Sequence, residues 1–299
     1  MKTGIVLDVD HFAVHDGPGI RTCLYMKGCP LHCMWCHSPQ SQRMETEILF
    51  TTNRCVHCGR CVGACPVGCQ IVTEDGERRY DRAKCRQCGK CVSLCPAGAL
   101  FVEGREMTVE AAAGELLRDR VFYRNSGGGV TISGGECLMQ AAFTRELLRT
   151  LKREQVHTIV ETSGYGRRQD LLELAEYADE FYYDYKLADE ELFEYYTGGK
   201  LRVVSENLGA LRKKTDRIVL RIPMIPGITD TEENVDEIYR IAAALQIEQI
   251  HLLPYNESAG AKYEWCGRAY ELEGISGNLR QVELLKDRAP AGTQVVIMK

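Results

Sequence analysis

The 299-residue sequence predicts an α/β protein: a partial, TIM-like (β/α)6 barrel with a small cysteine-rich module inserted into it. Short β-rich runs alternate with amphipathic helical stretches, and this alternation predicts the barrel. The cysteines predict the insertion, because thirteen of the fifteen lie between Cys23 and Cys95. We therefore expect the first part of the barrel in residues 1–48, the module in residues 49–105 and the remainder of the barrel in residues 106–299.

Six β-rich runs define the expected barrel strands, and most of them end in a polar or glycine-rich motif. In chain order they are IRTCLYMKG, GGVTISGGE, HTIVETSG, FYYDYK, RIVLRIPMIPG and IHLLPYN, and further strand-like pieces near the two ends are IVLDVDHFAV and QVVIMK. Helices are expected at roughly residues 107–119, 138–153, 169–178, 200–213 and 232–245, the last with an N-cap at Thr231. Because parallel strands present their carboxyl ends at one edge of a sheet, the motifs should share one rim.

Charge and hydropathy narrow the class of protein. The formal net charge of -5 argues against a general nucleic-acid binder, which is usually basic. No apolar run approaches the roughly 20 residues that a membrane helix needs, and Asp8 and Asp10 interrupt the first apolar stretch. We therefore expect a cytoplasmic protein without nucleic-acid or membrane partners. In that reducing compartment, dense cysteine indicates metal ligation rather than disulfides.

The first cysteine cluster lies in GCPLHCMWCHSP, where Cys29, Cys33 and Cys36 form a C-x3-C-x2-C run. Three buried thiols, or a zinc site with a distant fourth ligand, are the plain alternatives. Candidates for that ligand stand nearby at Cys23, His32 and His37. However, this spacing is uncommon for zinc, whereas a 4Fe–4S cluster on three cysteines leaves one iron free to bind a small molecule.

The surrounding residues carry a resemblance to a known family. Trp35 precedes the last cysteine of the run, and the flanking stretches read HDGPGIRT and KGCPLHCMWCHSPQS. The loop resembles the cluster loop of radical S-adenosylmethionine (radical SAM) enzymes and, more narrowly, that of the activating enzymes of glycyl radical enzymes. The resemblance implies an oxidoreductase whose open iron binds the amino and carboxylate groups of S-adenosylmethionine. Reductive cleavage would then yield a 5′-deoxyadenosyl radical, which abstracts hydrogen from a backbone glycine of a partner enzyme.

The same resemblance implies the cofactor-binding residues on the rim. SGGE would pack against the methionine moiety, while ETSG, DYK, RIPMIPG and HLLPYN would supply further contacts. A glycine turn, surface charges and a structural histidine are the plain alternatives. The implied residues are Trp35, His37, Gly134, Gly135, Glu136, Glu161, Thr162, Asp184, Tyr185, Lys186, Arg221 and His251. The resemblance leaves a monovalent cation open as a further cofactor, but similar activating enzymes have Asp where this chain has Glu161, and the longer side chain argues against that role.

An internal repeat marks the inserted module. CVHCGRCVGACPVG begins at Cys55 and CRQCGKCVSLCPAG begins thirty residues later, each reading C-x2-C-x2-C-x3-C-P. This pattern is typical of bacterial two-cluster ferredoxins, in which the fourth cysteine of each run serves the other cluster. It predicts one 4Fe–4S cube on Cys55, Cys58, Cys61 and Cys95, and another on Cys85, Cys88, Cys91 and Cys65. With the open cluster, the chain would hold three cubes.

Four cysteines remain outside these sets. Cys69 stands where the second half of the repeat has Ala99, and it is either a structural thiol or a substitute ligand. Cys23, Cys137 and Cys266 are interpreted as buried thiols.

The insertion also narrows the function. It makes the chain similar to the activating enzymes of glycerol or diol dehydratases, choline lyase and arylacetate decarboxylases, with a flavodoxin- or ferredoxin-type reductant. The two extra clusters could relay electrons, dock a reductase or support the fold, and the sequence does not rank these roles. One alternative is a radical SAM maturase of other peptides, but many of those carry clusters after the barrel, where this chain has only Cys266. Another is a polyferredoxin electron carrier, which would not need the open triad, SGGE or DYK.

Overall fold

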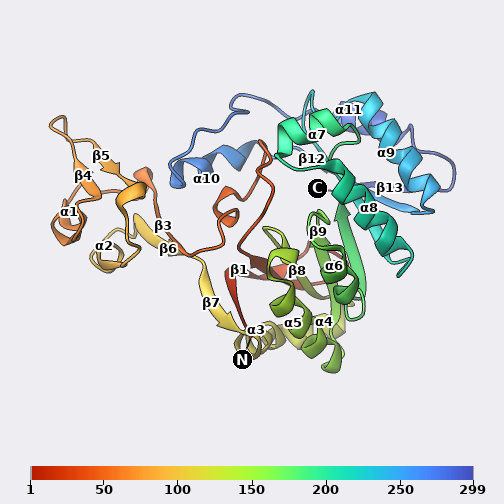
Figure 1. Cartoon of the computed structure of the whole chain (residues 1–299), viewed down its shortest axis with the longest axis horizontal. Helices are drawn as coiled ribbons and strands as arrows, with labels where there is room; N and C mark the ends of the chain where they lie inside the picture. The colour runs from red at the N-terminus through yellow and green to blue at the C-terminus, as the bar shows by residue number, and fades with distance from the viewer. Residues whose placement is uncertain (1, 299) are drawn as a thin grey trace.

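The computed structural model describes residues 2–298 and confirms a mixed α/β fold around a largely parallel sheet (Figure 1). Within these residues the main sheet has the order β13-β12-β11-β10-β9-β8-β2-β1-β7. Its strands are β1 (Thr3–Ala13), β2 (Arg21–Met26), β7 (Arg105–Thr108), β8 (Gly129–Gly134), β9 (His157–Thr162), β10 (Glu180–Asp184), β11 (Ile218–Met224), β12 (Gln249–Pro254) and β13 (Gln294–Ile297). All neighbours from β2 to β13 pair in parallel, whereas β1 lies antiparallel between β2 and β7. The six β-rich runs correspond to β2 and β8–β12.

Helices connect the parallel strands. They are α3 (Val109–Leu116), α4 (Arg120–Ser126), α5 (Ala141–Arg153), α6 (Arg168–Leu174), α7 (Glu190–Thr197), α8 (Leu201–Arg212), α9 (Glu232–Ala244), α10 (Gly260–Trp265) and α11 (Leu279–Lys286). The predicted cap of α9 is present, since Thr231 Oγ1 accepts a hydrogen bond from the backbone N–H of Asn234 at 3.2 Å. The short helices α4, α7, α10 and α11 were not expected from the sequence pattern. The described residues contain no helix that is long and apolar enough to cross a membrane.

Sheet register places the rim motifs side by side. Asp184 on β10 pairs with Arg221 on β11, and Arg221 pairs in turn with His251 on β12. Strand alternation then separates neighbouring side chains onto opposite faces. Tyr183 and Tyr185 point towards α8, where their hydroxyls contact Val204 O and Ser205 Oγ, each at 2.7 Å. Asp184 belongs to the opposite face.

The cysteine-rich segment lies beside the main sheet, at the left of Figure 1. Strands β3 (Glu47–Phe50) and β6 (Leu100–Glu103) form one antiparallel pair, and β4 (Gln70–Val72) and β5 (Arg78–Tyr80) form another. The two short helices α1 (Arg60–Ala64) and α2 (Lys90–Ser93) each follow a glycine with a φ of 72°. The internal repeat is therefore also a repeat of backbone conformation. Ile48, Phe50, Cys91, Ala99 and Leu100 form a small core of their own.

Helix α10 joins this segment to the rest of the molecule. The Arg82 guanidinium donates to the backbone oxygen of Trp265, and the rings of Phe101 and Trp265 meet edge to face at 5.9 Å. On its other side, the Tyr263 hydroxyl donates to Met34 O at 3.2 Å. The same helix thus contacts both the repeat and the first cysteine loop.

Candidate functional site

The first cysteine loop is held from outside by backbone hydrogen bonds. The N–H groups of His32 and Met34 donate to Thr197 O and Tyr196 O, at 2.8 and 3.0 Å. These acceptors lie at the end of α7, and Tyr263 on α10 binds the loop from another side. The cysteine loop is therefore held by two helices from the second half of the sequence.

The three thiols are withdrawn from solvent. Cys33 is buried, and Cys29 and Cys36 are half-buried. Burial raises the pKa of all three, that of Cys33 to about 12 even though Lys186 opposes the shift. The raised pKa values favour the protonated thiols. A bound metal centre would favour the thiolates instead, because the thiolate is the form of cysteine that binds metal.

The arrangement of donors differs from that of a single-ion site. Within residues 2–298, no three His, Cys, Asp or Glu side chains converge as they would around one metal ion. Cysteines that hold a 4Fe–4S cube need not converge in this way, because each binds a different iron.

The glycines of SGGE bring the rim against the cysteine loop. Gly134 has a φ of +110°, and a Cβ there would lie 2.2 Å from Met26 N; a Cβ on Gly135 would lie 2.3 Å from Gly28 O. The N–H of Glu136 donates to Gly28 O at 2.8 Å. In the structure, the close approach that requires glycine is made to the chain's own backbone, directly before Cys29.

Glu136 is buried in a set of hydrogen-bond donors. Its Oε1 accepts from the hydroxyl of Thr162 at 2.6 Å, and its Oε2 accepts from both the N–H and the hydroxyl of Ser163. Cys29 is close enough that the Glu136 carboxylate, after burial, contributes to raising its pKa. Sequence reasoning missed Ser163, although it lies inside the ETSG motif.

Four charged side chains form a row across β9, β10 and β11: Glu161, Asp184, Arg221 and, just beyond the end of β10, Lys186. Lys186 Nζ lies 2.8 Å from Asp184 Oδ2, Arg221 Nε lies 3.3 Å from Asp184 Oδ1, and Arg221 also pairs with Glu161. Ser133, another residue that sequence reasoning missed, donates to Glu161 at 2.5 Å. Burial would raise the pKa of Asp184, but Lys186 and Arg221 outweigh it and lower that pKa.

An unsatisfied polar atom lies beside the row. Within the described residues, His251 Nδ1 is buried without a hydrogen-bond partner, whereas Asp184 Oδ1 and Arg221 Nε form no hydrogen bond but face each other as an ion pair at 3.3 Å. His251 meets the Tyr182 ring edge to face at 5.3 Å. Burial and then Arg221 lower its pKa to about 4, so the imidazole is neutral near pH 7. Because buried polar groups are usually satisfied, the free Nδ1 of His251 indicates a place for a polar ligand.

The remaining candidates lie at different distances from this row. Trp35 is buried and packs against Tyr196, with ring centroids 6.1 Å apart. His37 is half-buried, which lowers its pKa. Tyr185 points to α8, so its side chain is not on the face that carries Asp184.

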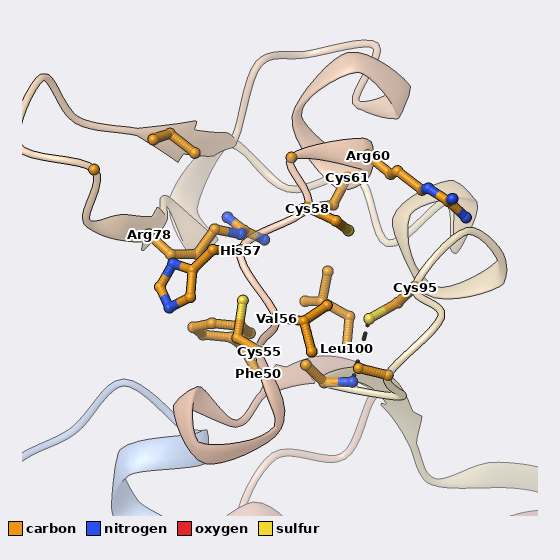
Figure 2. A pocket seen from close by; sticks show the side chains of 15 residues that line it. Phe50, Cys55, Val56, His57, Cys58, Arg60, Cys61, Arg78, Cys95 and Leu100 are labelled. Carbon is orange, nitrogen blue, oxygen red and sulfur yellow. Dashed lines mark hydrogen bonds between the residues drawn. The ribbon is translucent and has the colours of Figure 1, made fainter.

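In the repeat, Figure 2 shows the pocket that brings together Cys55, Cys58, Cys61 and Cys95. Three of these come from the first run and the fourth from the second. His57, Arg60 and Arg78 also line the pocket, and the Ala99 N–H donates to Cys95 Sγ at 3.2 Å.

The other four cysteines gather in the same way. Cys85, Cys88 and Cys65 are all close enough to Cys91 to raise its pKa, after burial. Cys69 Sγ lies 3.2 Å from Cys65 Sγ, and burial, then Cys65 and Cys85, raise the pKa of Cys69 to about 12. Cys65 of the first run therefore neighbours cysteines of the second run, and Cys95 of the second run shares a pocket with cysteines of the first.

Known proteins resemble this chain along most of its length. Residues 47–99 match the family described as 4Fe-4S dicluster domain, and residues 81–185 match the family described as 4Fe-4S single cluster domain. The chain is 41% identical over 272 residues to the isethionate sulfite-lyase activating enzyme of Oleidesulfovibrio alaskensis, covering 89% of this chain and 88% of the relative. It is 39% identical over 282 residues to the (2S)-3-sulfopropanediol sulfolyase activating enzyme of Bilophila wadsworthia, covering 93% of each.

A third relative and a solved structure are also similar to this chain. The benzylsuccinate synthase activating enzyme of Thauera aromatica is 39% identical over 284 residues, covering 92% of this chain and 86% of the relative. The structure of Streptococcus suis SuiB bound to precursor peptide SuiA shares the fold, with a TM-score of 0.52 and 12% identity over 90% of this chain and 46% of that chain. The resemblance of the cysteine loop is confirmed by these relatives, and the chain belongs to the radical SAM activating enzymes of glycyl radical enzymes.

Proposed function

We propose that Cys29, Cys33 and Cys36 hold a 4Fe–4S cluster whose open iron binds S-adenosylmethionine. The observation that carries this proposal is the position of the triad: Cys33 neighbours Lys186, and Cys29 neighbours Glu136. A cation and an anion therefore stand beside the cluster loop, as the carboxylate and ammonium groups of an amino acid require. When bound, S-adenosylmethionine supplies a carbon-centred radical that removes hydrogen from a protein glycine.

The chain's own residues would bind and orient the cofactor. Lys186 would bind its carboxylate, while Glu136, fixed by Thr162 and Ser163, would accept from its ammonium group. The unsatisfied Nδ1 of His251, with the guanidinium of Arg221 beside it on the next strand, would meet polar groups farther along the cofactor. The Glu161–Arg221 ion pair supports a site in which the guanidinium, rather than a monovalent cation, neutralises this carboxylate.

The protein substrate would be a glycyl radical enzyme. The relatives' names refer to lyases and a synthase, each followed by the words activating enzyme. Because such chemistry needs reduced iron–sulfur centres, we place the enzyme in the cytoplasm.

The main test is anaerobic incubation with dithionite and S-adenosylmethionine. Wild-type protein should form 5′-deoxyadenosine, and Cys33→Ala should form none while retaining most of its iron in the module. With a cognate glycyl radical enzyme, a glycine-centred radical should appear as a doublet by electron paramagnetic resonance. Deuterium at that glycine should move into 5′-deoxyadenosine. Near wild-type cleavage by Cys33→Ala would show that the triad assignment is wrong.

Residues 49–105 would form a ferredoxin-like module with two further cubes. The pocket of Cys55, Cys58, Cys61 and Cys95 supports one cube, and the grouping of Cys65 with Cys85, Cys88 and Cys91 supports the other. The parallel strands β2 and β8–β12 would make up the partial (β/α)6 barrel around the open cluster.

An acidic electron carrier, of flavodoxin or ferredoxin type, is the expected reductant. Residues 49–105 contain nine Lys and Arg but five Asp and Glu, although the whole chain carries a net charge of -5. Arg60 and Lys90 are exposed, occupy equivalent places in the repeat, and form no ion pair within residues 2–298. A basic surface around the module would attract an acidic partner.

A further inference from the structure

The two halves of the cysteine repeat differ at one buried position next to a proposed ligand. Cys69 and Ala99 occupy equivalent places, and each is 2% exposed. The backbone N–H of each donates to the sulfur of the cysteine four residues earlier: Cys69 to Cys65 at 3.3 Å, and Ala99 to Cys95 at 3.2 Å. The loops are therefore alike, and the thiol of Cys69 is an addition to one of them.

This extra thiol lies among the ligands of a single cube. Its Sγ is 3.2 Å from Cys65 Sγ, so the two sulfurs are in direct contact. Cys85, the first ligand of the same proposed cube, is its other thiol neighbour. An iron within reach of Cys65 is thus also within reach of Cys69 after a small side-chain rotation, because iron–cysteine bonds are short and χ1 rotation moves a sulfur without moving the backbone.

Packing alone does not require the thiol. A buried cysteine often acts as a small hydrophobic side chain. Here the matched position holds Ala99, which is equally buried and lies beside an equivalent amide–sulfur hydrogen bond. An alanine therefore suffices to fill this place in the fold.

We propose that Cys69 is a reserve ligand for the cube assigned to Cys85, Cys88, Cys91 and Cys65. When Cys65 is lost or modified, its bond to iron is replaced by a bond from Cys69, whose thiol proton passes to solvent. The iron keeps a thiolate ligand, and no electron is transferred. The cube on Cys55, Cys58, Cys61 and Cys95 has no such reserve. This inference rests on the proposed two-cube module.

The test compares matched alanine variants of the full chain, reconstituted and purified without oxygen. Wild type should contain about twelve irons, in three cubes. Cys65→Ala should keep about twelve, with a shifted rather than weakened resonance from its reduced clusters. Cys95→Ala, the matched control, should fall to about eight, and so should the double variant Cys65→Ala/Cys69→Ala.

A second variant, in which the extra cysteine is introduced into the other half of the repeat, keeps the test decisive if Cys65→Ala fails to fold. Adding Ala99→Cys to Cys95→Ala should restore the first cube and return the iron content to about twelve. If Cys65→Ala and this second variant both stay at about eight while wild type holds about twelve, Cys69 is a structural thiol and the inference is wrong. Only about eight irons in wild type would instead overturn the two-cube module, and this inference with it.

Discussion

Ser163 donates two hydrogen bonds to the same oxygen of Glu136: its N–H lies 2.8 Å and its hydroxyl 2.6 Å from Oε2. Glu136 is 1% exposed, and the hydroxyl of Thr162 donates a hydrogen bond to its other oxygen, Oε1. The end of β9 thus fixes a buried anion that belongs to the end of β8 and lies beside Cys29.

Ser163→Ala should destabilise the protein by about 1–3 kcal/mol, because it leaves a buried carboxylate short of a donor. Anaerobic denaturant unfolding measures this change. Ser258→Ala, at an exposed serine, is the control and should stay within about 0.5 kcal/mol of wild type. Equal stability of the two variants would contradict the role given to Ser163.

Lys186→Ala should weaken binding of S-adenosylmethionine by about 10–100-fold, the usual loss for one hydrogen bond between charged groups. Anaerobic titration calorimetry gives the dissociation constant. Lys200→Ala removes an exposed lysine that pairs with Glu194, and it should leave binding unchanged. An unaltered dissociation constant for Lys186→Ala would show that Lys186 does not bind the cofactor.

His251 should make stability depend on pH. Its pKa is lowered from 6.5 to about 4, first by burial and then by Arg221. Between these two pH values the unfolded chain binds more protons at His251 than the folded chain does. The contribution of the neutral imidazole to the free energy of unfolding is therefore complete above pH 6.5 and is lost as the pH falls towards about 4.

Urea unfolding between about pH 7 and pH 5 tests this dependence. His251→Asn should show a shallower loss of unfolding free energy than wild type as the pH falls. His15→Asn, at an exposed histidine, should follow the wild-type curve. Parallel curves for wild type and His251→Asn would rule out the effect.

Cys58→Ser and Cys88→Ser should each remove about four irons, since the two exposed cysteines are assigned to different cubes. Both variants should still cleave S-adenosylmethionine with dithionite, because the core of the main sheet does not include these residues. Loss of all iron from either variant would show that the clusters are not independent.

The double variant Arg60→Glu/Lys90→Glu should lower the activation rate with an acidic protein reductant by about tenfold and weaken its salt dependence. The rate with dithionite should change little, since that reductant needs no docking surface. Arg240→Glu, on α9, is the control. Equal loss with both reductants would leave the module a structural role.

The sequence by itself determined the local features of this protein. Cysteine spacing predicted an open triad, and the repeat predicted two runs whose last cysteines each serve the other run's cluster. The cap at Thr231 and the β-rich runs were likewise readable, because caps, ligand spacing and strand alternation act within a few residues of one another.

Only the tertiary structure decided the long-range partners. Arg221 pairs with Glu161 across 60 positions, and Ser163 reaches Glu136 across 27. It also decided that Tyr185 faces α8 and that Cys69 lies beside Cys65. Such contacts depend on which strands are neighbours, on their register and on the path of a loop, and a one-residue change of register would turn each side chain to the other face.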